Sequence, residues 1–472
     1  MSGESATTTS GLAYIRFAFS GKHRFVTGIA ALAAIGGFLF GYDTGIVSQA
    51  LPYIAKDFKA SAFEQSWIVA SLLLGAVIGA IGSGYLSDRI SRKWTKCLSG
   101  CVYVGGAIAS ALAQDVVWLC VARFVLGFAV GTASFVSPEY ISEQTPPRVR
   151  GGTVTYNQIM ITLGIFLAYL VGFGLRDVTD NWRWMLGIGG IPGAVLAISM
   201  VFVPHTPRWL VRKGRADEAR AVLERTRQDA DIDAELKDMK EVVEESSRYS
   251  IRDLFGRRLR SLMLMGIALA VFQQFVGINT VIYFATTILK YTGVSTNTSV
   301  ALAVFVGLTN FVTTIVAALL MDWVGRRRLL LPGTVILTVA LFALGAYFHW
   351  SALNQDHSWV GLVCLIVYII GFAIGLGPVF WLMISEIYPL HLRSKAMAIA
   401  TAFNWGANFI VSYYFLQMVD AIGRDATFWV YGGLGILAFA YFWVKVPETK
   451  NRSLEEIERE VGGERVVEAA AA

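Results

Sequence analysis

The chain has 472 residues, of which 55% are hydrophobic and only 16% are charged, and its mean hydropathy is +0.56. About a quarter of the residues of a soluble domain are charged, so this composition excludes an ordinary soluble protein. The net charge of +6 could suggest a nucleic-acid partner. The basic residues cluster at the ends of apolar runs, however, and this pattern favours membrane topology over nucleic-acid binding.

Apolar runs of about 20 residues, long enough to cross a bilayer, recur along the whole chain. The first run is too long for a signal peptide and has no cleavage site, so we expect it to remain in the mature protein. The runs cover residues 25–50, 66–87, 95–113, 116–138, 153–174 and 184–203, and then 261–289, 299–321, 329–349, 358–385, 397–419 and 427–446. This pattern predicts an all-α membrane protein with twelve transmembrane helices in two six-helix halves.

The segment between the two sets of runs is highly charged and predicts a soluble helical linker. We expect a division into residues 1–24, a first half 25–203, a linker 204–260, a second half 261–446 and a tail 447–472. Lys and Arg gather after the even-numbered runs, for example at Arg92 after the second and at Arg326 and Arg327 after the eighth. By the positive-inside rule, the linker and both termini are cytoplasmic, as in a multi-pass protein of the plasma or inner membrane.

The two halves repeat short patterns at matching places. Ile141-Ser142-Glu143, followed by Arg150, recurs as Ile384-Ser385-Glu386, followed by Arg393. Asp88 before Arg92 is matched by Asp322 before Arg326, and Pro204 is matched by Pro447. A duplicated six-helix unit is typical of transporters whose halves rock about a central site.

The polar side chains within the apolar runs are mostly neutral. Polar groups are costly in hydrocarbon, so those present mark a cavity or a helix contact. They are Gln158, Gln273, Gln274, Asn279, Asn310, Trp381, Asn404 and Asn408. A carboxamide donates and accepts hydrogen bonds, as a pair of sugar hydroxyls does, and a tryptophan offers a flat apolar face. A neutral set argues against an ionic substrate, although single amides can also serve only to hold helices together.

Two charged residues fall inside the spans. Asp43 lies late in the first span and Arg123 lies early in the fourth, which places both in the outer half of the membrane, where they can meet. A buried carboxylate beside an arginine is ionised while paired and gains a proton when the pair opens, so it can couple a proton to rocking. The alternative is a static ion pair.

Ten motifs in family order resemble the sugar porter family of the major facilitator superfamily over essentially the whole chain. The first half contributes GYDTG, GYLSDRISRK, RFVLGFAVG, PEYISEQTPPRVRGG and PHTPRWL. The second half contributes QQFVGINTVIYF, DWVGRRRL, GPVFWLMISEIYP, NWGANFIV and PETKNRSLEE. Three residues depart from the family pattern: Ser91 and Asn451 stand where glycine is usual, and His205 stands where glutamate is usual.

The resemblance implies a major facilitator fold and a sugar site. Gln158, Gln273, Gln274, Asn279, Asn310, Trp381 and Asn404 match the sugar-coordinating positions of the family, and Tyr283 and Asn408 lie close to them in sequence. Aspartate at the position of Asp43 resembles the proton symporters, whereas facilitators resemble GYN.

The cytoplasmic motifs suggest a gate. We expect Glu143 to pair with Arg92 and Arg150, and Glu386 to pair with Arg393 and with Arg326 or Arg327, with Asp88 in the same motif. These pairs would join the two halves and stabilise the outward-open state. Exposed pairs contribute only about 0 to 1 kcal/mol each, but a network of them can bias two states.

The sequence therefore predicts a symporter that imports a neutral monosaccharide with a proton by alternating access. Hexose is favoured over pentose, because Asn404-Trp405 resembles hexose porters. Alternatives are a polyol such as myo-inositol, a passive facilitator and a sugar sensor. We expect a monomer in the lipid bilayer with no cofactor and no metal, and no enzyme activity, because no nucleophile, base and metal set falls in one pocket.

Overall fold

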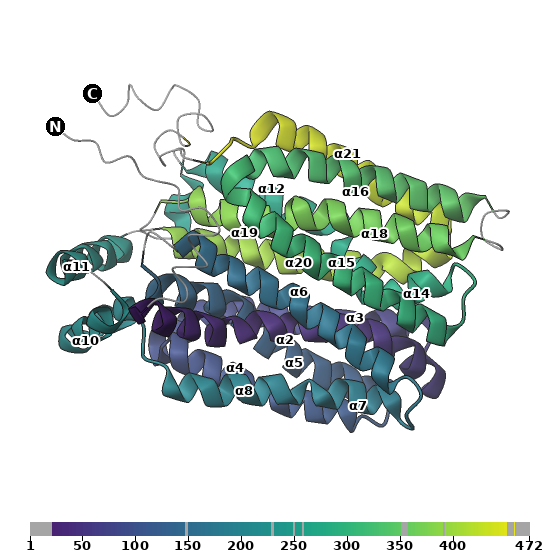
Figure 1. Ribbon diagram of the computed structural model, residues 1–472, viewed down its shortest axis with the longest axis horizontal. Helices are drawn as coiled ribbons and strands as arrows, with labels where there is room; N and C mark the ends of the chain where they lie inside the picture. Colours follow the sequence, from purple (N-terminus) through teal and green to yellow (C-terminus); the bar gives the residue numbers. More distant parts are fainter. Residues whose placement is uncertain are drawn as a thin grey trace.

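The computed structural model describes residues 21–146, 150–227, 231–248, 251–256, 259–350, 357–389, 392–450 and 457. The described part of the chain is helical and contains no strand. Its long helices lie side by side in two groups (Figure 1), with the N-terminal half below the C-terminal half in that view.

The N-terminal half has six spans, the last of which is interrupted. Its helices are α2 (Gly21–Asp57), α3 (Ala62–Ile90), α4 (Arg92–Ala111), α5 (Val116–Gln144), α6 (Arg150–Leu175), and α7 (Asn181–Ile188) followed by α8 (Gly190–Phe202). Ser61 caps α3 through a reciprocal capping box with Glu64, and Asp115 caps α5. These caps satisfy N–H groups that would otherwise lack partners at the membrane surface.

The C-terminal half also has six spans, two of which are broken. Its helices are α12 (Arg260–Phe275), α13 (Ile278–Tyr283) and α14 (Ala285–Lys290) in one span, α15 (Thr296–Val324), α16 (Arg326–His349), α18 (Ser358–Ile374) with α19 (Leu376–Glu386) in another, α20 (Arg393–Ile422) and α21 (Arg424–Lys445). Ten helical stretches of the described chain are long and apolar enough to cross a membrane. The spans in α4 and α20 are more polar, but α4 packs against α5 and α8, and α20 packs against α3 and α12.

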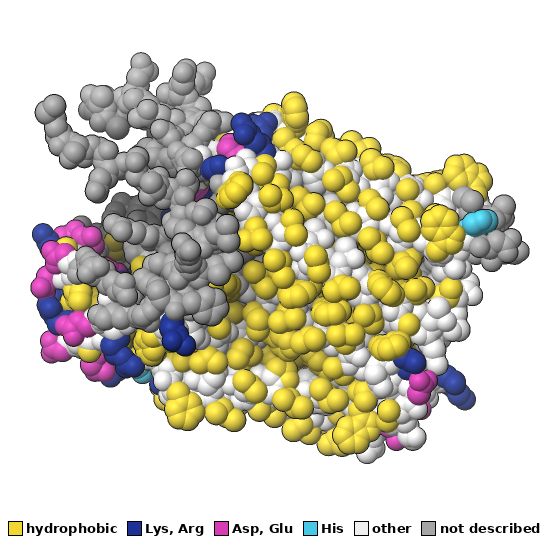
Figure 2. Space-filling model, in the orientation of Figure 1, with side chains coloured by type: hydrophobic (Ala, Val, Ile, Leu, Met, Phe, Trp, Pro, Cys, Tyr) yellow, Lys and Arg dark blue, Asp and Glu magenta, His cyan; other side chains and the backbone are white. Residues whose placement is uncertain are grey.

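The outer surface between the two ends is apolar. Figure 2 shows hydrophobic side chains over the middle of the molecule and charged side chains towards its two ends. Phe202, Val117 and Val444 are among the large hydrophobic residues that are exposed on the helices. A surface of this extent on a soluble protein would cause aggregation, whereas in a bilayer it faces lipid.

A group of short helices marks one end of the bundle, which we call the linker end (Figure 1). It comprises α9 (Pro207–Arg212), α10 (Ala216–Thr226), α11 (Ile232–Arg248) and the 3₁₀ helix η2 (Ile251–Phe255). Arg227 donates to the Gln144 carbonyl at 2.9 Å, and the Arg225 guanidinium lies 4.5 Å from the Phe25 ring centroid. Helices α9, α10 and α11 are therefore attached to the N-terminal half, whereas η2 packs against α12 and α20 of the C-terminal half.

Candidate functional site

Two spans of the C-terminal half break at the level where the predicted site residues lie. Between α12 and α13 the backbone of Gly277 has φ +87°, a conformation that glycine adopts without the penalty of a Cβ. Between α18 and α19 the backbone turns at Gly375, and Pro378 has no N–H to continue the helical pattern. Broken helices at mid-membrane expose backbone carbonyls and are typical of transporter binding sites.

Four of the predicted amides form one hydrogen-bonded network beside these breaks. Gln273 donates to the carbonyl of Leu376, the first residue of α19 after the second break, at 3.0 Å. Asn404 donates to Gln273 at 2.7 Å, and Gln274 donates to Asn404 at 3.1 Å. Asn279 donates to Gln274 at 2.8 Å across the first break. The network contains no charged group, and it holds α12, α13, α19 and α20 together.

A second polar group lies where α13 meets α2 and α20. The hydroxyl of Tyr283 is buried close to Thr44 and Asn408, and no hydrogen-bond partner is present for it among the described residues. Asn408 accepts a hydrogen bond from Ser412 at 3.0 Å. The indole N–H of Trp405 is likewise buried without a partner in the described chain. Unpaired buried donors of this kind suit a hydroxyl-bearing ligand or ordered water.

The other three predicted sugar residues lie on different helices. Gln158 is half-buried on α6, Asn310 is buried on α15, and Trp381 is half-buried on α19 with its ring 4.8 Å from that of Phe380. Within the described residues, no hydrogen bond joins these three side chains to the amide network, so their place in the site stays a prediction.

The two charged residues inside the N-terminal half are in contact. Arg123 Nη2 lies 3.2 Å from Asp43 Oδ2, and both side chains are almost fully buried. Arg123 also donates through Nε to the Ile68 carbonyl at 2.6 Å. The contact expected from the sequence is therefore present, and it joins α2, α3 and α5.

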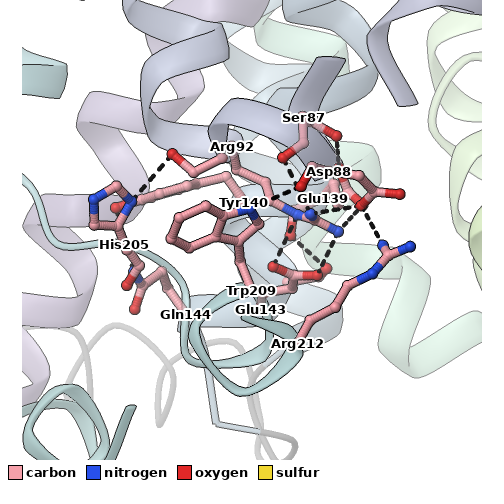
Figure 3. Close-up of polar contacts among 12 residues, drawn as sticks. Ser87, Asp88, Arg92, Glu139, Tyr140, Glu143, Gln144, His205, Trp209 and Arg212 are labelled. Carbon is pink, nitrogen blue, oxygen red and sulfur yellow. Dashed lines mark hydrogen bonds and ion pairs between the residues drawn. The ribbon is translucent and has the colours of Figure 1, made fainter. Parts of the chain in front are cut away.

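A larger ionic network lies at the linker end of the N-terminal half (Figure 3). Arg92 is 2.8 Å from Asp88, 2.8 Å from Glu139 and 3.2 Å from Glu143. Arg212 of α9 also binds Asp88, at 2.5 Å, and Trp209 donates its indole N–H to the Asp88 carbonyl at 3.1 Å. The network fixes the linker to the turn between α3 and α4.

The C-terminal half has a matching but smaller network. Arg326 is 2.8 Å from Glu386, and Thr449 donates to the same carboxylate at 2.6 Å. Arg327 donates to the Trp443 carbonyl and Arg393 to the Tyr388 carbonyl. The side chain of Arg150, expected beside Glu143, lies outside the described residues, as does that of Asp322.

The predicted pairs Arg92–Glu143 and Arg326–Glu386 are present, but the expectation that they join the two halves is wrong for this structure. Each pair lies within one half, because the short turn before α4 or α16 places its arginine beside the end of a helix in the same repeat. The halves are instead joined at the end opposite the linker, which we call the far end. There Ser66 donates to Gln417, Tyr169 to the Ile282 carbonyl, and Tyr53 to Asn297.

Some residues of these networks were missed by the sequence reasoning. Glu139 lies four residues before Glu143, but the equivalent position in the second repeat is Leu382, so comparison of the repeats gave no signal for it. Glu448, which accepts hydrogen bonds from the N–H groups of Arg326 and Arg327, stands at the position equivalent to His205. The match of Pro447 with Pro204 could have indicated it.

The arrangement is that of a polar centre closed at the far end, with neutral amides on one half and a buried acid on the other. Residues 29–461 match the model of the Sugar (and other) transporter family. The chain belongs to this family. It is thus a multi-pass membrane transporter and not an enzyme.

Individual relatives cover nearly the whole chain. The galactose-proton symporter of Escherichia coli is 39% identical over 91% of this chain and 93% of its own length. The D-xylose transporter of Levilactobacillus brevis is 38% identical over 90% and 93%. The solved structure of the major facilitator proton:xylose symporter XylE, bound to 6-bromo-6-deoxy-D-glucose, has a TM-score of 0.80 and 30% identity, covering 93% of this chain and all of that chain. This likeness shows the major facilitator fold.

Proposed function

We propose that the protein imports a neutral monosaccharide together with a proton by alternating access, and that a hexose is the preferred substrate. Support for the sugar comes from the uncharged network of Gln273, Gln274, Asn279 and Asn404 at two helix breaks. Each amide can exchange a bond within the network for a bond to a ring hydroxyl. The relatives named for galactose and xylose handle substrates of the same chemistry.

The site as proposed also includes Gln158, Tyr283, Asn310, Trp381 and Asn408. Tyr283 and Asn408 bring unpaired or exchangeable polar atoms to the wall between the halves. Trp381 would supply the apolar face for a pyranose ring, which binds aromatic groups through its C–H bonds. Asn404 is followed by Trp405, and this pair is the reason for favouring hexose.

The single observation that carries the proton coupling is the buried contact between Asp43 and Arg123. An ionised carboxylate in the membrane interior is tolerated because its partner is 3.2 Å away. When the pair separates, the carboxylate is left desolvated and binds a proton instead. The relatives that are named as proton symporters support this assignment.

The proposed topology puts the linker and both termini in the cytoplasm of a cell whose plasma membrane the protein crosses. In that orientation the hydrogen bonds at the far end close the extracellular side, and the structure corresponds to an inward-facing state. The two halves, approximately 25–203 and 261–446, would rock about the polar centre, while the ionic networks of the linker end hold each half rigid.

Uptake of labelled sugars into proteoliposomes, with and without an inward pH gradient, tests the proposal. We expect accumulation of glucose or galactose above the external concentration only when the outside is acidic, and alkalinisation of the medium when sugar is added. Equal initial rates with and without the gradient would make the protein a facilitator. Preference for xylose, arabinose or myo-inositol would overturn the choice of hexose while leaving the transport proposal intact.

A further inference from the structure

The third span of each repeat begins after a residue in the same backbone conformation, but the residue type differs between the two repeats. Gly325 precedes α16 with φ +102° and ψ 159°, and Ser91 precedes α4 with φ +93° and ψ 156°. Residues other than glycine seldom adopt this region. A serine held there calls for an explanation, because glycine would fit the backbone without strain.

In the second repeat, a carboxylate fills the space over the glycine. Glu448 accepts the backbone N–H of Arg326 at 2.9 Å and that of Arg327 at 3.2 Å, so an anion caps the start of α16. A Cβ on Gly325 would lie 2.6 Å from Glu448 Oε2, so the carboxylate would have to move away from its two N–H partners to admit a side chain. Glycine at this place therefore leaves the room that the glutamate cap occupies.

In the first repeat, both members of this pair are replaced. Ser91 caps α4 with its own hydroxyl, which accepts the N–H of Trp94 at 3.3 Å. The residue equivalent to Glu448 is His205, whose ring Nδ1 lies 3.1 Å from the Ser91 hydroxyl oxygen. Ser91 and His205, two of the three departures from the family pattern, are thus in direct contact. Where the second repeat has the carboxylate of Glu448, the first repeat has an imidazole that can be neutral or positively charged.

His205 is also connected to the ionic network of the linker end. Its ring stacks on Trp209 with centroids 4.9 Å apart and an angle of 21°. Trp209 in turn donates to the Asp88 carbonyl, and Figure 3 shows Trp209 and His205 beside the group around Arg92. On the other side, Gln144 of α5 donates to the His205 carbonyl at 3.1 Å.

We propose that the Ser91–His205 pair is a pH-sensitive latch that helps to hold the start of the linker on α4 while His205 is neutral and weakens this attachment when His205 is protonated. With the imidazole neutral and its proton on Nε2, Nδ1 accepts the Ser91 hydroxyl proton while the hydroxyl oxygen accepts the N–H of Trp94. A protonated ring brings a cation to the start of α4, where the positive end of the helix dipole opposes it and where His205 itself stands in place of the capping carboxylate of the second repeat.

Burial and the two cations near His205 act in the same direction. Burial lowers the pKa of His205 below its ordinary value, and Lys93 of α4 and Arg215 before α10 lower it further, while Glu218 of α10 raises it by a smaller amount. A lowered pKa means that docking is more stable with the neutral ring, fully so above the ordinary histidine pKa of about 6.5. The stabilisation is lost as the pH falls through the lowered value. If the protein imports protons as proposed, transport acidifies the linker side and so lowers the pH to which His205 is exposed.

The latch rests on the structure at the linker end, and its direct test needs no sugar. Histidine-labelled protein in nanodiscs is titrated by NMR, with His205→Gln to assign its signal among the five histidines of the chain. We expect His205 to titrate below the ordinary pKa, and Ser91→Gly, which removes the hydroxyl donor, to raise that pKa. Titration at or above the ordinary value in the wild type would overturn the proposal.

The functional test uses a variant that copies the second repeat, S91G/H205E. Sugar counterflow is measured with equal pH on both sides, at about 7.5 and at about one unit below the pKa that the NMR titration gives for His205, where roughly ten rings are protonated for each neutral one. We expect the wild-type rate to fall at least ~3-fold more than that of the double variant, because only the wild type changes the charge of residue 205 from neutral to positive over this range. The matched control His349→Gln, at the far end, should respond as the wild type does. The same pH response in the wild type and the double variant would refute the latch, whereas absence of any counterflow would refute the proposed transport function instead.

Discussion

Replacement of Gln274 by alanine tests the amide network most directly, because this side chain is bonded to the three other members. Its amide donates to Asn404 at 3.1 Å and to Gln273 at 3.2 Å, and its oxygen accepts from Asn279 at 2.8 Å. Gln274→Ala removes these three hydrogen bonds and leaves the oxygen of Asn404 and the amide of Asn279 with fewer partners.

The expected magnitude follows from the number of bonds. Each net hydrogen bond contributes about 0.5–1.5 kcal/mol, so the three together hold the network with roughly 2–4 kcal/mol. The loss of these internal bonds lowers the stability of the protein, so the Tm should fall, although the unchanged apolar packing of α12 should keep the protein folded. Loss of one direct bond to a sugar hydroxyl, together with the displacement of Asn279 and Asn404, should raise the sugar Kd by about tenfold, since 1.4 kcal/mol corresponds to a factor of ten.

Isothermal titration calorimetry with the purified protein measures the Kd, and uptake into proteoliposomes measures KM. The matched control is Asn181→Ala, which removes one buried amide hydrogen bond, to the Arg176 carbonyl at 2.9 Å, in the N-terminal half at the far end. We expect its Kd to equal that of the wild type. A Gln274→Ala protein that is folded and binds sugar as tightly as the control would refute the assignment of the site to this network.

Three further predictions concern coupling, stacking and the helix break. Asp43→Asn, which mimics the protonated acid, should abolish accumulation driven by a pH gradient while sparing sugar exchange between equal pools; undiminished sugar-induced alkalinisation would show another proton route. Trp381→Ala should weaken sugar binding more than Trp405→Phe does, because only the first removes a stacking face, and equal Kd values in calorimetry would contradict this. Gly277→Ala should lower the Tm and raise the sugar Kd, because alanine at φ +87° costs about 1–2 kcal/mol. Gly406→Ala, on a helix with open space around the position, should leave both values unchanged.

The sequence predicted the architecture because lipid imposes simple requirements on it. Each span needs about 20 apolar residues, and basic residues gather on one side, so runs and charges can be counted without knowledge of packing. The break at Gly277 escaped this reasoning, because the run 261–289 is apolar throughout and a glycine inside such a run is usually a packing contact. The glycine also packs closely against a residue far along the chain, because the Tyr431 ring would lie 3.3 Å from an added Cβ, and such a contact cannot be read from the run itself.

Partners within one repeat were predicted better than partners between repeats. The contact of Asp43 with Arg123 follows from the depth of each residue in its span. Depth does not predict whether a gate pair lies within one half or joins the two halves. Arg92 could reach either half from the turn before α4, and only the position of Glu139 and Glu143 on the neighbouring helix α5 places the pair within the N-terminal half. The role of Gln273 in satisfying the Leu376 carbonyl also depends on tertiary structure alone.

The positions of the proposed proton and sugar sites suggest how one can affect the other. Asp43 is followed by Thr44, which lies close to the Tyr283 hydroxyl on the opposite half, so the acid is one residue away from the wall of the polar centre. Arg123 binds both Asp43 and the Ile68 carbonyl. Ile68 is two residues from Ser66, whose bond to Gln417 closes the far end.

In the proposed mechanism, neutralisation of Asp43 therefore acts on two elements at once. It removes the charge that holds Arg123 against α2, and Arg123 is the side chain that connects α2 to the start of α3. The same start of α3, through Ser66, and Ser48 of α2, which lies 3.4 Å from Thr286, make two of the contacts by which the halves meet. In this mechanism, a bound sugar draws Tyr283 and Asn408 into its own hydrogen bonds and thereby changes the proton affinity of Asp43. Coupling between two ligands is reciprocal. The proton must therefore change the sugar affinity by the same factor.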